Sequence, residues 1–194
     1  MLFRRKYEFK PDRTDGGFFK KLHLTSIQRK HLLKWGLISL VLVVLSLLQD
    51  VVLCRVSIYG ATFDMVACGI LLCAMFFDPE TTVIFTLISS TLYYFSGSAP
   101  GAYSIALLTV QGTLLCIFRL GHLQRRFSAI FLCAAVGMVV YELAVFLIGV
   151  FLESTTWERF PIFAMTGGLS VAAMPLLYLV FSSISNIGGT SWKE

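Results

Sequence analysis

Charged residues are scarce in this sequence of 194 residues. Only 14% of the chain is Asp, Glu, Lys or Arg, whereas 57% is hydrophobic, and soluble domains carry about 25% charged residues. The apolar residues stand in long runs with few charges between them, rather than mixed evenly with polar positions. This scarcity argues against a soluble domain and indicates a helical bundle in a membrane.

The sequence also lacks the motifs on which most enzyme chemistry depends. It contains no HExxH, no GxSxG and no phosphate-binding loop, and no histidine stands near a serine or cysteine within an apolar run. The five cysteines form no CxxC pair, and four of them lie inside apolar runs, where small core residues are expected. We therefore predict neither enzyme activity nor a bound cofactor or metal.

Positive charge is concentrated near the start of the chain, where ten of the sixteen lysines and arginines precede Trp35. Such a segment favours the cytoplasmic side of a membrane and anionic lipid headgroups. No nucleic-acid-binding motif accompanies the charge, so no nucleic acid partner is expected. Residues 1–26 are predicted to be a basic cytoplasmic tail. It either lays a short helix along the headgroups, around Phe18, Phe19 and Leu22, or stays loosely ordered and is held there by its charge.

Six apolar segments follow, each about as long as a helix that crosses a hydrocarbon layer of ~30 Å. Residues 27–182 are therefore predicted to form one all-α membrane domain, with a short cytoplasmic tail at 183–194. The spans cover about residues 34–53, 62–77, 79–95, 101–118, 127–152 and 160–181. Before the third span, Asp78, Pro79 and Glu80 predict a helix start with Asp78 as its cap.

An even number of spans places both termini on the same side of the membrane, and charge indicates which side. The side that holds the termini collects fourteen lysines and arginines, whereas the other side has only Arg55 and Arg159. Because positive residues stay inside, both termini are predicted to be cytoplasmic.

Small residues recur at four-residue spacing on three of the predicted spans. Such ladders let helices approach closely in lipid, so each predicts a helix contact, either within the chain or with the helix of a partner. The ladders are Thr82, Thr86 and Ser90; Ala129, Cys133 and Gly137; and Ala164, Gly168 and Ala172. Pro175 predicts a kink in the last span.

Glu142 lies near the middle of the fifth span, the depth at which a charge is most costly. We expect its side chain to face the bundle interior, either protonated or paired with a hydroxyl such as that of Tyr141, Tyr93 or Tyr94. Two roles stay open for Glu142: a coupling or ligand-binding residue, or a polar lock between helices.

Three further polar residues of the spans stand nearer the predicted membrane surfaces. Asp50 and Asp64 lie towards the outer side, where a charge is less costly. Arg119 ends the fourth span on the cytoplasmic side, and its long side chain is expected to snorkel to the headgroups.

Several short motifs occur in the order typical of one bacterial family. The first span ends in Leu47-Leu48-Gln49, and the second opens with Gly60 followed four residues later by Asp64. The uncharged turn at residues 96–101 reads SGSAPG, and Arg119 closes the fourth span. In these features the chain resembles the rod-shape-determining protein MreD family over about residues 41–119, although Phe63 stands where the family usually has proline.

The resemblance implies a non-catalytic subunit of the bacterial cell-elongation machinery, located in the inner (plasma) membrane. Such a subunit binds MreC and links MreB to peptidoglycan synthesis by RodA and a penicillin-binding transpeptidase, which maintains cell shape. Together with the ionisable residues of the spans, the motifs nominate eight residues as partner-binding or polar-lock candidates: Gln49, Asp50, Asp64, Gly97, Pro100, Gly101, Arg119 and Glu142.

The alternative is the substrate-binding subunit of an energy-coupling-factor vitamin transporter, which has a similar size, six spans and a related architecture. The first span of those subunits typically carries an Ala-x-x-x-Ala docking face, whereas residues 36–44 of this chain are mostly bulky. Four tyrosines at the outer ends of spans would either line a vitamin pocket or belong to an interfacial aromatic belt; they are Tyr59, Tyr93, Tyr94 and Tyr103.

Overall fold

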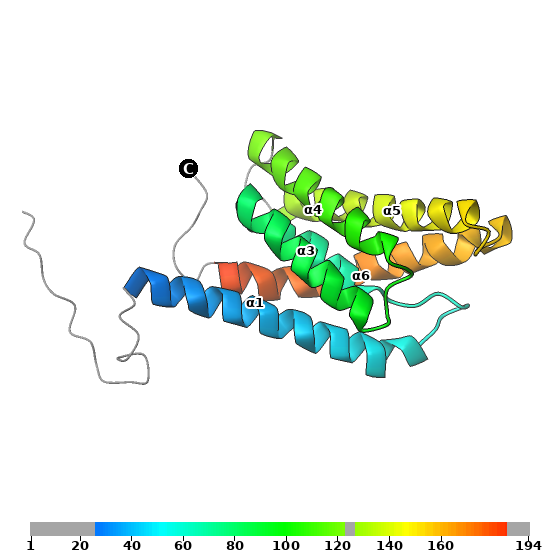
Figure 1. Cartoon of the computed structure of the whole chain (residues 1–194), viewed down its shortest axis with the longest axis horizontal. Coiled ribbons are helices and arrows are strands. Elements are labelled where there is room, and N and C mark those ends of the chain that lie inside the picture. The colour runs from blue at the N-terminus through cyan, green and yellow to red at the C-terminus, as the bar shows by residue number, and fades with distance from the viewer. Residues whose placement is uncertain (1–25, 123–126, 186–194) are drawn as a thin grey trace, which may run out of the picture.

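The computed structural model describes residues 26–122 and 127–185, which fold into an all-helical bundle (Figure 1). Its helices are α1 (Ser26–Val51), α2 (Met65–Ala74), α3 (Pro79–Phe95), α4 (Tyr103–His122), α5 (Phe127–Phe151) and α6 (Phe160–Ser185). The short 3-10 helices η2 (Leu53–Arg55) and η3 (Trp157–Arg159) precede α2 and α6. No β-strand occurs within the described ranges.

The helices fall on the predicted apolar segments, with some differences at their ends. α3 begins at Pro79 and ends at Phe95, as expected, but the side chain of Asp78 makes no capping hydrogen bond, so that part of the prediction is wrong. α1 begins at Ser26, where the sequence offers a helix start signal at Thr25 or Ser26, and so extends beyond the span predicted at about 34–53. Residues 183–185 continue α6 instead of joining the C-terminal tail. The rest of both predicted tails lies outside the described residues.

Four helices are long and apolar enough to cross a membrane, judged by length and composition: α1, α4, α5 and α6. The other two are shorter, with 17 residues in α3 and only 10 in α2. At 1.5 Å per residue, α2 extends for about 15 Å, which is half the thickness of a hydrocarbon layer. The fold is therefore that of an all-helical membrane protein, in which six complete crossings remain a prediction.

The short helix α2 lies at the centre of the bundle. It contacts each of the other five α-helices, and nine of its ten residues, from Val66 to Ala74, are buried. Non-helical backbone is tolerated at membrane depth where protein surrounds it or where it lines a cavity. Because protein encloses α2, this helix can begin and end inside the bundle.

The C-terminal end of α2 is held by side chains of α3 and α4. The last carbonyls of a helix have no partner within that helix and need donors from elsewhere. The donor and acceptor pairs are Thr82 Oγ1 with Ala74 O at 3.4 Å, Arg119 Nη1 with Met75 O at 2.5 Å, and Cys116 Sγ with Phe77 O at 3.2 Å. These bonds allow polar backbone to end inside the bundle.

Arg119 does not snorkel to the surface as predicted. Its side chain is only 3% exposed and is directed at the backbone that follows α2. A guanidinium carries five N–H donors, which suits it to a helix end rich in carbonyl acceptors. Hydrogen bonding to these buried carbonyls is therefore more favourable for the guanidinium than extending to the nearby membrane surface.

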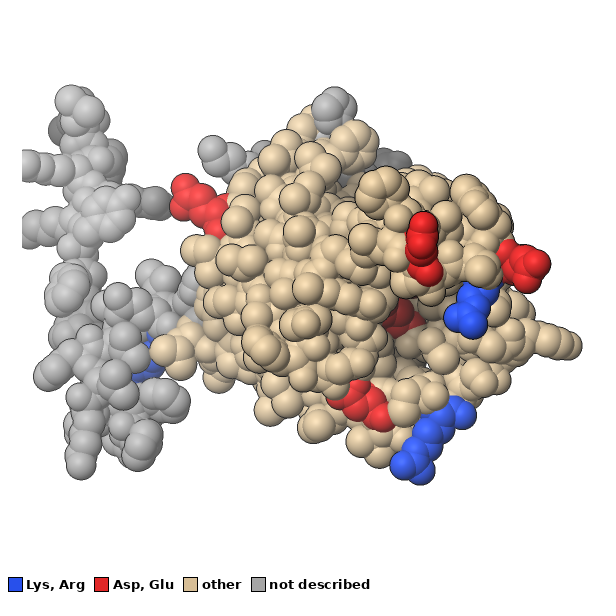
Figure 2. Space-filling view, turned by 45° about the vertical axis from the view of Figure 1, so that its right-hand side comes forward, with Lys and Arg blue, Asp and Glu red and all other residues tan. Residues whose placement is uncertain are grey.

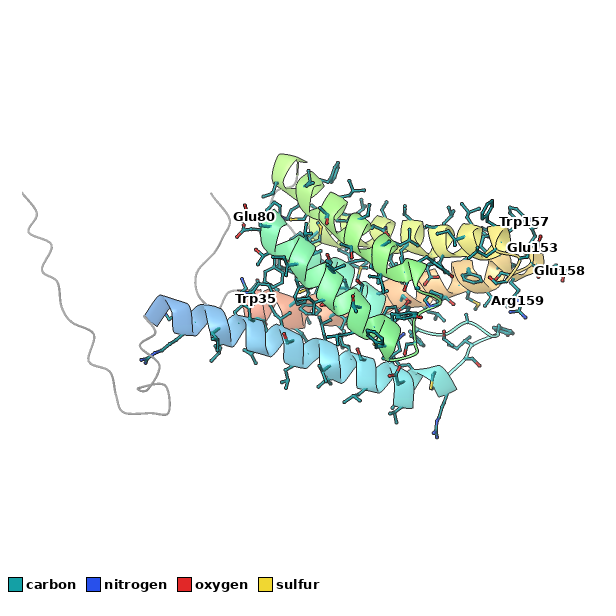
Figure 3. All side chains as sticks on the ribbon, viewed as in Figure 1. Trp35, Glu80, Glu153, Trp157, Glu158 and Arg159 are labelled. Carbon is teal, nitrogen blue, oxygen red and sulfur yellow. The ribbon has the colours of Figure 1, made fainter. Side chains whose placement is uncertain are left out.

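The bundle has two distinct ends. The termini end holds the start of α1 and the end of α6, and Trp35 stacks on Phe77 there with ring centroids 4.8 Å apart. The far end holds η2, η3 and the turn between α3 and α4. Figure 3 labels Trp35 and Glu80 towards the termini end, and Glu153, Trp157, Glu158 and Arg159 at the far end.

Two of the three predicted ladders make contacts within the chain, and the third does not. Thr82, Thr86 and Ser90 are buried, and Ser90 Oγ lies 3.4 Å from Thr109 Oγ1 of α4. Gly137 packs against Leu115 of α4 so closely that a Cβ atom on the glycine would lie 2.8 Å from the leucine. Ala164, Gly168 and Ala172 instead form an exposed face of α6, so of the two predicted contacts only one with the helix of a partner stays open for them.

Candidate functional site

A network of polar side chains surrounds the N-terminal end of α2. Asp64 caps the helix by accepting a hydrogen bond from the backbone nitrogen of Ala67 at 3.0 Å. Its other carboxylate oxygen accepts from Tyr93 OH at 2.8 Å, and Gln49 Nε2 donates to Oδ1 at 3.3 Å. Asp64 is only 8% exposed, so these donors replace the water that a carboxylate would otherwise bind.

Two further hydrogen bonds tie the backbone of this region to α1 and α6. The Val66 nitrogen donates to Gln49 Oε1 at 2.9 Å, and the Asp64 nitrogen donates to Ser170 Oγ at 2.8 Å. The first N–H groups of a helix lack partners within it. Side chains from α1 and α6 therefore complete the start of α2, as side chains from α3 and α4 complete its end.

A pocket of about 310 Å³ lies beside this network at the far end of the bundle. Figure 2 shows a hollow on this side of the molecule, with an acidic side chain visible inside it and basic side chains nearby. The lining residues are Gln49, Gly60, Thr62, Asp64, Tyr93, Ser98, Pro100, Tyr141, Glu142, Val145, Arg159, Ile162, Phe163 and Thr166. The pocket thus draws on α1, α3, α5 and α6, on η3, and on the loops that precede α2 and α4.

Glu142 and Tyr141 are buried on the pocket wall without polar partners. Glu142 is 6% exposed and Tyr141 is 1% exposed. No hydrogen bond or ion pair joins the Glu142 carboxylate to another described residue, and the Tyr141 hydroxyl also has no hydrogen-bond partner there. Of the two predicted states of Glu142, the pairing with a tyrosine hydroxyl is therefore not found, because Tyr93 donates to Asp64 instead. A protonated Glu142 stays a prediction.

Gly167 of α6 leaves the space that the Glu142 side chain occupies. A Cβ atom at Gly167 would lie 3.3 Å from Cγ of Glu142 and 3.7 Å from its Cβ. A larger residue at position 167 would press on the Glu142 side chain. The packing of α6 on α5 consequently fixes where the Glu142 carboxylate sits in the pocket.

The turn between α3 and α4 closes one side of the site. Gly97 has a φ of +81°, which strains residues with a side chain, and a Cβ at Gly101 would lie 2.5 Å from Tyr103 Cε1. Both glycines therefore shape the turn. Pro100 lines the pocket, and Ser98 Oγ donates to Asp50 Oδ1, which ties the turn to α1.

The eight nominated residues thus fall into three groups. Gln49, Asp64, Pro100 and Glu142 meet at the pocket. Asp50, Gly97 and Gly101 hold the adjoining turn or shape it. Arg119 acts at the opposite end of α2.

Ser170 and Arg159 were not predicted as site residues. Ser170 is fully buried and binds backbone 106 residues away in sequence. Ser170 lies on the buried stripe of α6, three residues after Gly167 and four before Met174. A polar residue on a core face must have a partner, so this position in the sequence could have indicated Ser170 as a site residue. Arg159 ends the short helix η3, and its place at the pocket follows only from the fold.

A second feature is a long apolar groove of about 740 Å³ between α1 and α3. Trp35 and Asp50 mark its two extremes on α1, and Val66 and Ile70 of α2 also line it. Several large side chains along it are more than half exposed, among them Leu47, Ile84 and Leu92. The groove shares no lining residue with the pocket.

Comparison of the chain with models of known protein families, with curated proteins and with solved structures gives no match. The candidate sites are therefore defined by their residues and geometry alone. Within the described residues, no group of three or more His, Cys, Asp or Glu side chains is arranged to hold a metal ion.

Proposed function

We propose that this chain is a non-catalytic membrane subunit that holds the transmembrane helix of a partner protein in the groove between α1 and α3. The groove is the observation that carries the proposal. From Trp35 to Asp50, α1 rises about 22 Å, so the groove follows most of the thickness of a hydrocarbon layer. Its walls are apolar, as the surroundings of a transmembrane helix must be.

Small polar residues in the groove suit a helix partner better than they suit lipid. Ser39 and Ser46 line it from α1, and Ser89 lines it from α3. In lipid, helices associate through close packing and hydrogen bonds, and serine provides both. Acyl chains gain nothing from these hydroxyls.

The MreD-like motifs supply the identity of the partner. On that basis the occupant is the transmembrane helix of MreC, and the complex belongs to the bacterial cell-elongation machinery. Through MreC or directly, the chain would link MreB filaments to the peptidoglycan synthase formed by RodA and a penicillin-binding transpeptidase, and so maintain cell shape. The basic residues before Trp35 would contact MreB or anionic lipid.

We further propose that the bundle crosses the inner membrane with all six helices. In this arrangement the termini end is cytoplasmic and the far end is external, as the distribution of lysine and arginine favours. The enclosure of α2 by the other five helices explains how a helix of 10 residues can take part in such a fold.

The experiment is purification of the tagged chain in mild detergent from its own cells, followed by mass spectrometry of the co-purified proteins. We expect MreC, with RodA or its transpeptidase. The variant Ser46→Trp, which fills the groove, should reduce recovered MreC by at least tenfold.

Two variants control for the added bulk of tryptophan. Ala106→Trp places it on the exposed face of α4, and Ala172→Trp places it on the exposed ladder of α6. Recovery of MreC should be unchanged in both. Loss of MreC in Ala172→Trp alone would contradict the groove and move the contact to α6.

The pocket at the far end favours a second candidate, the substrate-binding subunit of an energy-coupling-factor vitamin transporter. A cavity of about 310 Å³ with buried polar groups on its wall has the size and character of a small-molecule site. In that case the same purification would recover an ATPase module with its membrane coupling subunit, and a vitamin would be released when the protein is denatured.

A further inference from the structure

The pocket at the far end combines acidic and aromatic groups in a way that points to a class of ligand. Asp64 and Glu142 contribute two carboxylates. Tyr93, Tyr141 and Phe163 contribute three aromatic rings. Aromatic faces and a carboxylate together are the usual means of binding an organic ammonium group, because the ring face and the anion both attract positive charge.

The two carboxylates are not equivalent. Asp64 already accepts hydrogen bonds from Ala67, Tyr93 and Gln49, whereas Glu142 has no partner among the described residues although it is 94% buried, being 6% exposed. A buried ionised group without a partner is strongly unfavourable. Glu142 is therefore the carboxylate that gains most from a cation in the pocket.

Tyr141 adds a second unsatisfied group on the same wall. Its hydroxyl is buried and makes no hydrogen bond to the described part of the chain. Buried polar atoms in proteins almost always have a partner. Because Tyr141 and Glu142 both line the pocket, we expect a ligand there to reach both.

The remaining walls set the shape of the ligand. Val145, Ile162 and Pro100 are apolar, and Arg159 is the basic residue on the lining. The volume of about 310 Å³ lies at the lower end of the range for small-molecule pockets. The lining holds two acidic residues and one basic residue, so it suits a ligand with a positive charge better than an anion.

We infer that this pocket binds an organic monocation, with an ammonium or guanidinium group held by Glu142 and Tyr141 and an apolar body against Val145, Ile162 and Phe163. The cation comes either from a free small amine or from the lysine or arginine side chain of a peptide segment at the outer surface. The inference is independent of the partner helix, because the groove and the pocket share no lining residue.

The test uses the purified full chain in lipid nanodiscs and measures binding by calorimetry and by thermal stabilisation. The probes are phenethylammonium and its neutral analogue 2-phenylethanol. A second pair comprises acetyl-Gly-Lys-Gly-amide and the same peptide with norleucine in place of lysine. We expect saturable binding of at least one cation, and binding at least tenfold weaker for its neutral analogue.

The source of the cation follows from which pair responds. Binding of phenethylammonium but not of the lysine peptide assigns the pocket to a free amine, and the reverse assigns it to a peptide side chain. Absence of saturable binding for both cations at millimolar concentration would overturn the inference, as would equal binding of a cation and its neutral analogue.

Variants locate the binding in the pocket. Glu142→Gln keeps the shape of the side chain but removes its charge, and should weaken cation binding at least tenfold. Tyr141→Phe removes only the hydroxyl and should weaken it about threefold, which keeps the test valid if Glu142→Gln does not fold. Glu80→Gln and Tyr178→Phe, both outside the pocket, should leave binding unchanged. Unchanged binding in both pocket variants would contradict the assignment.

Discussion

Asp64 and Asp78 each stand immediately before a helix, yet only one of them caps it. The Asp64 carboxylate is buried and accepts three hydrogen bonds, including one from the helix that it caps. Asp78 is exposed and makes no capping bond, although Pro79 at the first helical position suits a helix start. The residue scale thus separates two aspartates that look alike in sequence.

This difference predicts unequal losses of stability. Asp64→Ala leaves the Ala67 nitrogen without its acceptor and the Tyr93 hydroxyl with only the Ser98 carbonyl at 3.4 Å, and should cost about 1–3 kcal/mol. Asp78→Ala is the matched control and should cost under about 0.5 kcal/mol, as surface substitutions usually do. Thermal unfolding in detergent measures both. Equal losses in the two variants would show that the network around α2 contributes little.

Part of the site was predictable from single residues, and part was not. Gln49, Asp64 and Glu142 stood out as polar residues in apolar segments, which are costly without a function or a partner. Their partners did not follow from sequence, because Tyr93 and Ser170 reach Asp64 only once α3 and α6 pack on α2. Arg119 was predicted to reach the membrane surface, because its acceptor, the Met75 carbonyl, likewise comes close only once α4 packs on α2.

At the scale of elements, the other five α-helices are arranged around α2. Hydropathy marks an apolar segment at about 62–77, but only the bundle shows that its helix has 10 residues and that five helices enclose it. Apolar residues that face lipid and those that face protein look the same in sequence. The helix positions were therefore predictable, whereas the central place of α2 was not.

The contact of α4 with α2 and α3 requires a glycine. A Cβ at Gly112 would lie 2.8 Å from Thr86 Cγ2 and 3.4 Å from the Cβ of Ala74. Gly112→Leu should therefore force α4 away from both neighbours and destabilise the bundle by about 1–3 kcal/mol. The measurement is the midpoint of thermal unfolding.

Gly168 provides the matched control for that prediction. It also lies within a helix, but nothing stands within 4 Å of a Cβ placed there. Gly168→Leu should leave the midpoint unchanged or raise it slightly, because leucine favours a helix more than glycine does. A larger loss in Gly168→Leu than in Gly112→Leu would contradict the packing described for α4.

At the scale of the whole molecule, a native cysteine reports which end of the bundle faces outward. Cys54 lies at the far end and is exposed, whereas the other four cysteines are buried. If the far end is external, a maleimide that cannot cross the inner membrane should label Cys54 in cells in which only the outer membrane has been permeabilised. Cys54→Ala should abolish the labelling. Labelling only after lysis would reverse the orientation.

The groove remains the feature on which the proposed function depends. It runs along α1 and α3, and the α6 ladder of Ala164, Gly168 and Ala172 offers a second exposed face. A partner helix in the groove would cover exposed side chains such as Leu47 and Ile84. Only a measurement of contact in the native membrane distinguishes these surfaces directly.

That measurement is photocrosslinking in living cells, with a photoreactive amino acid placed at Ser46 in the groove, at Ala172 on α6, or at Ala106 on α4. We predict a crosslink from position 46 to the transmembrane helix of MreC, and none from positions 106 and 172. A crosslink from position 172 without one from position 46, or lipid adducts alone at all three positions, would contradict the account.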